Sequence, residues 1–163
     1  MKKTISIIVL FAVLVISVSA YSGRIYEAAE GYKAPLFTVE KSDTTISLAD
    51  LRGRYVLVNF WSSADAQSRM RANQYDALSN DLSQEQFCQL SVNLDRSERL
   101  FREIVRRDNL SAKSQFHVSD GEAACISGAY HLNEGFNSFL IDPEGRIVEL
   151  NPDIETINTH IGI

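Results

Sequence analysis

The chain has 163 residues and a formal net charge of −5. That length suits one domain of ordinary size, which can bury a single hydrophobic core. The acidic balance argues against nucleic acid and anionic membrane surfaces as partners, because both repel a negatively charged protein. We therefore expect no nucleic-acid binding, and membrane association only through an N-terminal signal segment that stays uncleaved.

The first twenty residues are typical of a secretory signal rather than of a folded domain. Lys2 and Lys3 give a positive start, residues 5–18 are almost wholly apolar, and Ala20 ends a stretch of small residues. This three-part order is that of a signal peptide, and the apolar run is short for a membrane-spanning helix. The sequence predicts a signal peptide at residues 1–20 and export to the periplasm or another extracytoplasmic location.

Only two cysteines follow the predicted signal, Cys88 and Cys125. Export would place them in an oxidising compartment, where disulfides persist. Their spacing is neither that of a metal clamp nor that of a redox dithiol. Two structural interpretations stay open, because the cysteines either form one disulfide or are two buried thiols that act as small apolar residues.

Hydrophobic patterning predicts that strands and helices alternate after a polar N-terminal extension at residues 21–33. Residues 55–61 are nearly continuous in β-branched and aromatic side chains, which is typical of a central parallel strand covered on both faces. The other expected elements are, in chain order, a strand at 36–40, a turn at 41–45, a helical turn at 47–51, a helix at 65–82, a strand at 87–94, a helix at 97–108, a strand at 116–118, a helix at 122–130, a hairpin of strands at 138–141 and 146–150, and a helix at 153–160.

This order of elements implies an α/β sandwich with a mixed central sheet. A strand, a helix and a second strand in succession favour a parallel pair, and the later hairpin adds antiparallel strands. On the helix expected at 65–82, the stripe predicted to face the core consists of Met70, Tyr75, Leu78 and Leu82.

Three segments resemble the extracytoplasmic, TlpA-like branch of the thioredoxin-like superfamily. The stretch KAPLFTVEKSDTTISLADLRGRYVLVNFW is similar to the family's entry into its central strand, and SFLIDPEGRIVE is similar to its hairpin. Arg69 stands where the family often has an arginine just after its second cysteine. The resemblance implies a thioredoxin-like three-layer sandwich over residues 34–163, with redoxin chemistry wherever the family's redox site is kept.

The positions that match the family's redox site lack its chemistry. The family has a Cys-x-x-Cys at the start of the helix after the central strand, where the helix dipole lowers a thiol pKa, and a cis-proline facing it. Asp65 and Ser68 align with the two cysteines, and Phe136 aligns with the proline. A cis bond before a non-proline residue costs about 3–4 kcal/mol, so we expect a trans bond and a reshaped loop at residues 134–137. The resemblance therefore implies a degenerate active site without a catalytic residue.

The residues around this position have both structural and functional interpretations. Asp65 either caps the helix, which is the interpretation we favour, or presents a carboxylate in a former active-site cleft. The candidate contact residues for a partner are Trp61, Phe136 and Asn137, although local packing is favoured for Trp61. His117, His131 and His160 are scattered along the chain, so we expect no metal site and no cofactor. The arginines of the helix at 97–108 are expected to form a solvated face: Arg99, Arg102, Arg106 and Arg107.

We therefore predict an exported, non-catalytic binding or accessory protein, a pseudoenzyme whose partner is a protein or peptide. The alternative is a thiol-disulfide oxidoreductase that uses Cys88 and Cys125 as a relocated redox pair. Neither cysteine lies at the start of the helix where the fold activates a thiol, which makes this alternative the weaker one. A third interpretation is a structural spacer that binds no ligand.

Overall fold

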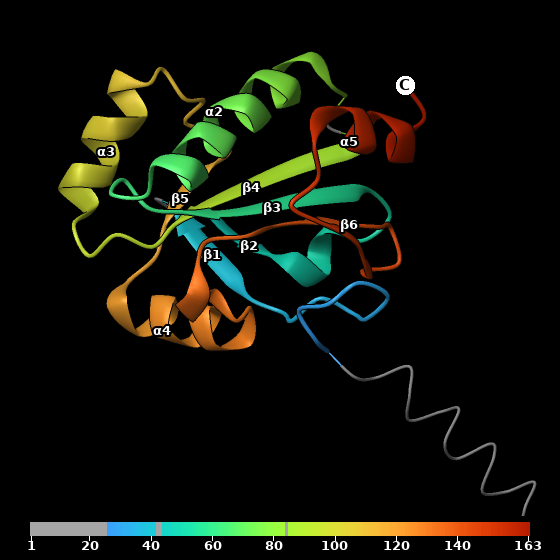
Figure 1. The fold of residues 1–163 in the computed structure, drawn as a ribbon, viewed down its shortest axis with the longest axis horizontal. Coiled ribbons are helices and arrows are strands. Elements are labelled where there is room, and N and C mark those ends of the chain that lie inside the picture. The colour runs from blue at the N-terminus through green and yellow to red at the C-terminus, as the bar shows by residue number, and fades with distance from the viewer. Residues whose placement is uncertain (1–25, 42–43, 84) are drawn as a thin grey trace, which may run out of the picture.

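The structure is a computed structural model that describes residues 26–41, 44–83 and 85–163. Its centre is a five-stranded mixed sheet in the order β5-β4-β3-β6-β7, with helices on both faces (Figure 1). The predicted α/β three-layer sandwich with a mixed sheet is thereby confirmed. The predicted signal peptide lies outside the described residues. Among those described, no helix is long and apolar enough to cross a membrane.

The elements follow the expected order closely. The strands are β1 (Thr38–Lys41), β2 (Thr44–Ser47), β3 (Tyr55–Trp61), β4 (Phe87–Asn93), β5 (Gln115–His117), β6 (Ser138–Ile141) and β7 (Ile147–Leu150). The helices are η1 (Leu48–Leu51), α2 (Ala66–Asp81), α3 (Glu98–Arg107), α4 (Asp120–Ala129), η2 (Leu132–Glu134) and α5 (Ile154–Ile161). β3 lies parallel to β4 and antiparallel to β6, while β1 and β2 form a separate antiparallel hairpin.

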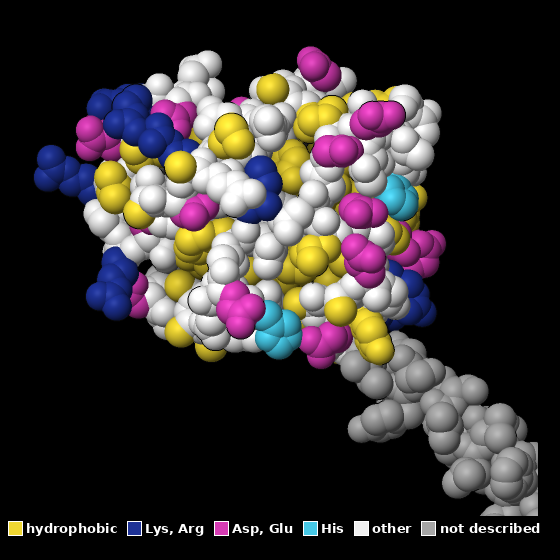
Figure 2. All heavy atoms as spheres, viewed as in Figure 1, with side chains coloured by type: hydrophobic (Ala, Val, Ile, Leu, Met, Phe, Trp, Pro, Cys, Tyr) yellow, Lys and Arg dark blue, Asp and Glu magenta, His cyan; other side chains and the backbone are white. Residues whose placement is uncertain are grey.

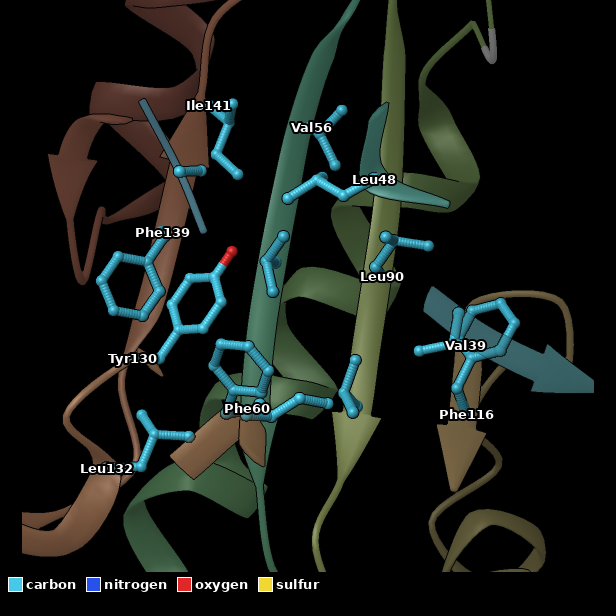
Figure 3. Packing of buried hydrophobic residues seen from close by; sticks show 14 of the residues in the cluster. Val39, Leu48, Val56, Phe60, Leu90, Phe116, Tyr130, Leu132, Phe139 and Ile141 are labelled. Carbon is cyan, nitrogen blue, oxygen red and sulfur yellow. The ribbon is translucent and has the colours of Figure 1, made fainter. Parts of the chain in front are cut away.

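Successive side chains of β3 point to opposite faces of the sheet and so build two cores. Val56, Val58 and Phe60 pack on the side of α4 and the β1–β2 hairpin, where the rings of Phe60, Tyr130 and Phe139 lie side by side (Figure 3). Leu57 packs instead with residues of α2 and α5. Full burial of one such side chain contributes about 1.5–3 kcal/mol, so these two cores hold the sheet in place beneath α2.

A row of buried polar side chains crosses the sheet under α2. Asn59 donates from Nδ2 to the hydroxyl of Ser91 at 3.2 Å, and the hydroxyl of Ser138 donates to Asn59 Oδ1 at 2.8 Å. The three residues belong to β3, β4 and β6 and are fully buried. Because a buried polar group is costly without a partner, this row also fixes the register of the three central strands.

Three expectations about the elements are wrong. β1 begins at Thr38 rather than at 36, and β2 occupies Thr44–Ser47, where we expected a turn to run into the helical turn. The β-branched residues of β2 suit a hairpin strand, and each pairs with a residue of β1. α4 begins at Asp120 rather than at 122, because the carboxylate of Glu122 accepts a hydrogen bond from the backbone N–H of Ser119 at 2.9 Å and caps the helix there.

Met70 does not face the core, as the hydrophobic pattern had predicted, and its side chain is 58% exposed. The buried residues of α2 are Ser68, Ala72, Tyr75 and Asp76. Met70 lies two positions from both Ser68 and Ala72, which places it about 200° around the helix from either one. The small and polar residues Ser68, Ala72 and Asp76 thus occupy the inner face that the apolar pattern assigned to Met70. The prediction for Tyr75 is confirmed, and Leu78 and Leu82 are partly buried against the same core.

Candidate functional site

The site that matches the family's redox centre is the loop between β3 and α2. Asp65 caps α2, because its Oδ1 accepts a hydrogen bond from the backbone N–H of Ser68 at 2.7 Å. Hydrogen bonds from Ser68 hold the pKa of the Asp65 carboxyl below its usual range. The structure therefore confirms that Asp65 caps the helix and places an anion at its N-terminus.

Ser68 is fully buried beneath this cap. Its hydroxyl donates to the backbone carbonyl of Asp65 at 3.2 Å and accepts a hydrogen bond from the backbone N–H of Ser62 at 3.3 Å. The hydroxyl thus joins the end of β3 to the first turn of α2. Because no described base lies within hydrogen-bond distance of it, Ser68 is not arranged as a nucleophile.

Asp95, which follows β4, accepts hydrogen bonds from the whole start of this loop. Its Oδ1 accepts a hydrogen bond from the hydroxyl of Ser62 at 2.6 Å, and the backbone N–H of Ser63 donates to both carboxylate oxygens at 3.1 Å. Asn93 donates from Nδ2 to Oδ2 at 3.0 Å. Burial raises the pKa of Asp95, but these hydrogen bonds outweigh it and the net pKa is lowered. Asp95 is therefore a charged clamp on the loop.

The loop at the proline position is held by Arg71 of α2. Arg71 donates from one Nη to the carbonyl of Phe136 and from the other to Asn151 Oδ1 at 2.7 Å. The backbone N–H of Phe60 donates to the carbonyl of Asn137 at 3.1 Å. The peptide bond before Phe136 is trans, as predicted. Hydrogen bonds to α2 and β3 thus fix this loop beside the start of α2.

The candidate contact residues differ in exposure. Trp61 is fully buried and packs against Phe101 of α3, as the favoured packing interpretation expected, so it is not available as a contact residue. Phe136 and Asn137 are half-buried, and Phe136 packs against the larger core. Met70 is the large exposed apolar side chain nearest in sequence to Asp65, and it lines a shallow hollow with Ala66, Arg69, Asn73 and Asp108.

Arg69 closes this hollow through an ion pair with the residue that follows α3. Its Nε and one Nη donate to the two carboxylate oxygens of Asp108 at 2.5 and 2.6 Å. The hydrogen bond from Arg69 holds the pKa of Asp108 below its usual range, and the same bond raises the pKa of Arg69. Arg69, which the sequence aligned with the family's arginine, is therefore engaged in linking α2 to α3.

The two cysteines lie away from the start of α2 and are not bonded to each other. Cys88 is half-buried on β4, and burial raises the pKa of its thiol. Cys125 is exposed on α4, at a groove lined by Leu36 and Ile126 among others. The prediction of a buried thiol is therefore wrong for Cys125, because the outer face of α4 carries it.

The histidines have separate local contacts. His117 Nε2 lies 2.7 Å from the carbonyl of Asp95, and His131 Nε2 lies 2.8 Å from a carboxylate oxygen of Glu27. His160 packs its ring near that of Tyr55. Within the described ranges, no group of three or more potential ligands is placed to hold a metal ion.

Sequence reasoning missed Asp95, Arg71 and Asn151 as members of this site. A usable signal existed for Asp95, because parallel strands end at the same edge of a sheet, and polar residues lie within two positions of the ends of both β3 and β4. Arg71 and Asn151 are 80 positions apart in sequence, and no local pattern links them.

The sheet order, the helix after the central strand and the hairpin together define a thioredoxin-like domain. A model of the AhpC/TSA family matches residues 31–150, and the chain belongs to that family. The resemblance to the TlpA-like redoxins is thereby confirmed.

Two curated relatives are thiol-disulfide oxidoreductases. The chain is 25% identical over 163 residues to thiol-disulfide oxidoreductase ResA of Bacillus subtilis strain 168, covering 92% of this chain and 87% of that protein. It is 27% identical over 120 residues to ResA of Bacillus cereus, covering 73% and 67% of the two chains. The crystal structure of a thioredoxin-like protein from Parabacteroides distasonis matches with a TM-score of 0.73 and 31% identity, over 85% of this chain and 98% of that one.

Proposed function

We propose that the protein is an exported, non-catalytic member of its family that binds a protein or peptide segment beside the N-terminus of α2. The observation that carries the proposal is that a carboxylate already caps the N-terminus of α2. Where a redoxin needs a thiolate, the capping carboxylate of Asp65 accepts the N–H of Ser68. The apolar, signal-like start of the sequence supports export.

The absence of a suitable thiolate supports the loss of exchange chemistry. Disulfide exchange begins when a thiolate attacks one sulfur of a substrate disulfide, which releases the other sulfur as a thiolate. Asp65 is ionised at neutral pH, since its pKa is lowered, and it repels an approaching thiolate. The thiol pKa of Cys88 is raised by burial, which reduces its thiolate fraction.

The fixed loop beside α2 supports a binding role. Arg71 holds the carbonyl of Phe136, so the loop presents one arrangement to a partner instead of ordering on contact. Next to it, the first turns of α2 expose Ala66, Gln67 and Met70. The exposed methionine of α2 and the half-buried phenylalanine of the loop each offer apolar contact area to a peptide segment.

An insulin disulfide-reduction assay with a dithiol regenerating system tests the loss of catalysis. We expect the wild type to show the same rate as the Cys88→Ser/Cys125→Ser variant, and both to match the rate without protein. A wild-type rate above that of the double-serine variant would overturn the proposal and favour Cys88 and Cys125 as a redox pair.

Co-purification from the native compartment tests binding. We expect Met70→Glu and Phe136→Ala to lose the proteins that the wild type retains. Leu150→Ala is the matched control, because Leu150 is 41% exposed and ends β7, an edge strand of the sheet. Equal retention by all four proteins would indicate a spacer without a ligand and would contradict the binding role.

A further inference from the structure

The outer face of α3 is rich in arginine, although the protein as a whole is acidic. Arg99, Arg102 and Arg106 are exposed and, together with Glu103, line a shallow hollow on this helix. Arg96 and Arg107 extend the exposed arginines beyond both ends of the hollow. In Figure 2 the dark-blue side chains gather at the upper left, over the position of α3 in Figure 1. The whole chain carries a net charge of −5, so this is a local concentration of positive charge.

Folding of α3 does not need this face. The helix is held from below by Phe101 and Ile104, which are buried in a cluster with Trp61. Arg106 and Arg107 lie in the last turn, where the helix dipole favours cations. Arg99 lies in the first turn, where the dipole disfavours them. Arg102 and Arg106 are four positions apart, a spacing at which like charges repel. Arg99 therefore carries charge that works against the helix, whereas Arg106 and Arg107 do not.

Carboxylate groups of the protein pair with only some of the arginines on the outer face of α3. Arg102 has Glu98 at 3.4 Å, and Arg107 has Asp108 at 3.6 Å. In the described part of the chain, no carboxylate oxygen lies within 4.0 Å of the guanidinium nitrogens of Arg99 or Arg106. Two guanidinium groups on one face are thus available to an external anion.

We propose that this face of α3 docks an acidic segment of a partner protein. Arg99 and Arg106 are seven positions apart, which is about 10 Å along a helix. Carboxylates two positions apart in an extended chain point to the same side and lie about 7 Å apart, so the flexible arginine side chains can reach both. Guanidinium groups bind carboxylates through two parallel hydrogen bonds, which suits arginine better than lysine for this contact.

The proposal goes beyond the binding role proposed above and does not rest on it. An anionic bilayer is disfavoured as the occupant, because a surface broad enough to reach α3 would also face the acidic remainder of the protein. A short acidic segment would contact only the arginine-rich face of α3 and would avoid that repulsion.

Fluorescence anisotropy with a labelled oligoglutamate peptide tests the proposal. The variant Arg99→Gln/Arg106→Gln removes the two arginines without a carboxylate, and Arg52→Gln/Arg146→Gln removes two exposed arginines from outside the helix. At about 20 mM salt we expect the first variant to bind about three- to tenfold more weakly than the wild type, and the second to bind within twofold of it. Raising the salt to about 150 mM should weaken wild-type binding.

Three results would overturn the proposal. Equal weakening by both double variants would show that only net charge matters. Binding of the wild type to phosphatidylglycerol vesicles but not to the peptide would identify a membrane surface instead. A melting temperature for Arg99→Gln/Arg106→Gln well below that of the wild type would mark the arginines as structural. We expect an equal or higher melting temperature, since Arg99 opposes the helix dipole.

Discussion

Strand β3 and the loop that follows it lie in contrasting surroundings. From Val56 to Phe60 most side chains are apolar and fully buried in the two cores, whereas the chain beyond Trp61 enters a loop of polar residues. Those polar groups bond to one another, with Ser62 and Ser63 held by Asp95. Apolar burial of the strand preserves the scaffold, while the chemistry of the loop can change. Once the loop satisfies its own hydrogen bonds, the fold needs no thiol there.

The largest expected effect lies within the apolar strand. Phe60→Ala should lower the free energy of unfolding by about 3–5 kcal/mol, because it leaves a cavity beside Tyr130 and Phe139. Phe136→Ala is the matched change at the loop and should cost less than half as much, since Phe136 is only half-buried. Urea unfolding of both variants measures the difference. Equal losses would contradict the contrast between the buried strand and the loops at the site.

A smaller loss is expected when the clamp of the loop is removed. Asp95→Ala should lower the free energy of unfolding by about 1–3 kcal/mol, because it leaves the donors of Ser62, Ser63 and Asn93 without their acceptor. Glu144→Ala, which removes an exposed carboxylate from the turn before β7, should change it by less than about 0.5 kcal/mol. Indistinguishable urea midpoints for the two variants would show that the clamp is dispensable.

The same carboxylate gives the loop a pH dependence. The folded pKa of Asp95 is lowered, so its stabilisation is complete above the unfolded value of about 3.9 and is lost as the pH falls through the folded value. Asp95→Asn should therefore lose less stability than the wild type between about pH 5 and pH 2. Unfolding curves across that range measure the two slopes, and parallel slopes would contradict the assignment.

The smallest change in stability is expected at the helix cap. Asp65→Ala should cost about 0.5–2 kcal/mol, because the N–H of Ser68 loses its acceptor. Asp65→Ser keeps a capping oxygen and should cost only a few tenths of a kcal/mol. Thermal unfolding separates the two variants. A serine as damaging as the alanine would mean that the cap is not what Asp65 contributes.

Local patterns were sufficient to predict most of the fold. The continuous apolar run of β3 and the turn residues between β6 and β7 each predict their element from a few neighbouring positions. The start of α2 at Asp65 also followed from the residues themselves.

Long-range contacts could not be predicted in the same way. The apolar pattern assigned Met70 to the core, but burial of Asp76 on the inner face of α2 depends on donors from Ser111 and Ser114, 35 or more positions away. The hydrogen bond from Arg71 to Asn151 spans 80 positions. Asn59 lies in the apolar strand β3, and nothing near it in sequence indicated its hydrogen bond with Ser138. In each case a polar group is placed by a distant partner rather than by its neighbours.

Restoring the two sulfurs tests most directly whether the scaffold is intact and only the nucleophile is missing. Asp65→Cys/Ser68→Cys places thiols at the positions that the family uses, and Ser68 is close in size to cysteine. We predict that this variant forms an internal disulfide and, with a dithiol regenerating system, reduces insulin faster than the wild type, whose rate stays at background. A wild-type rate equal to that of the variant, with Asp65 and Ser68 unchanged, would contradict the account.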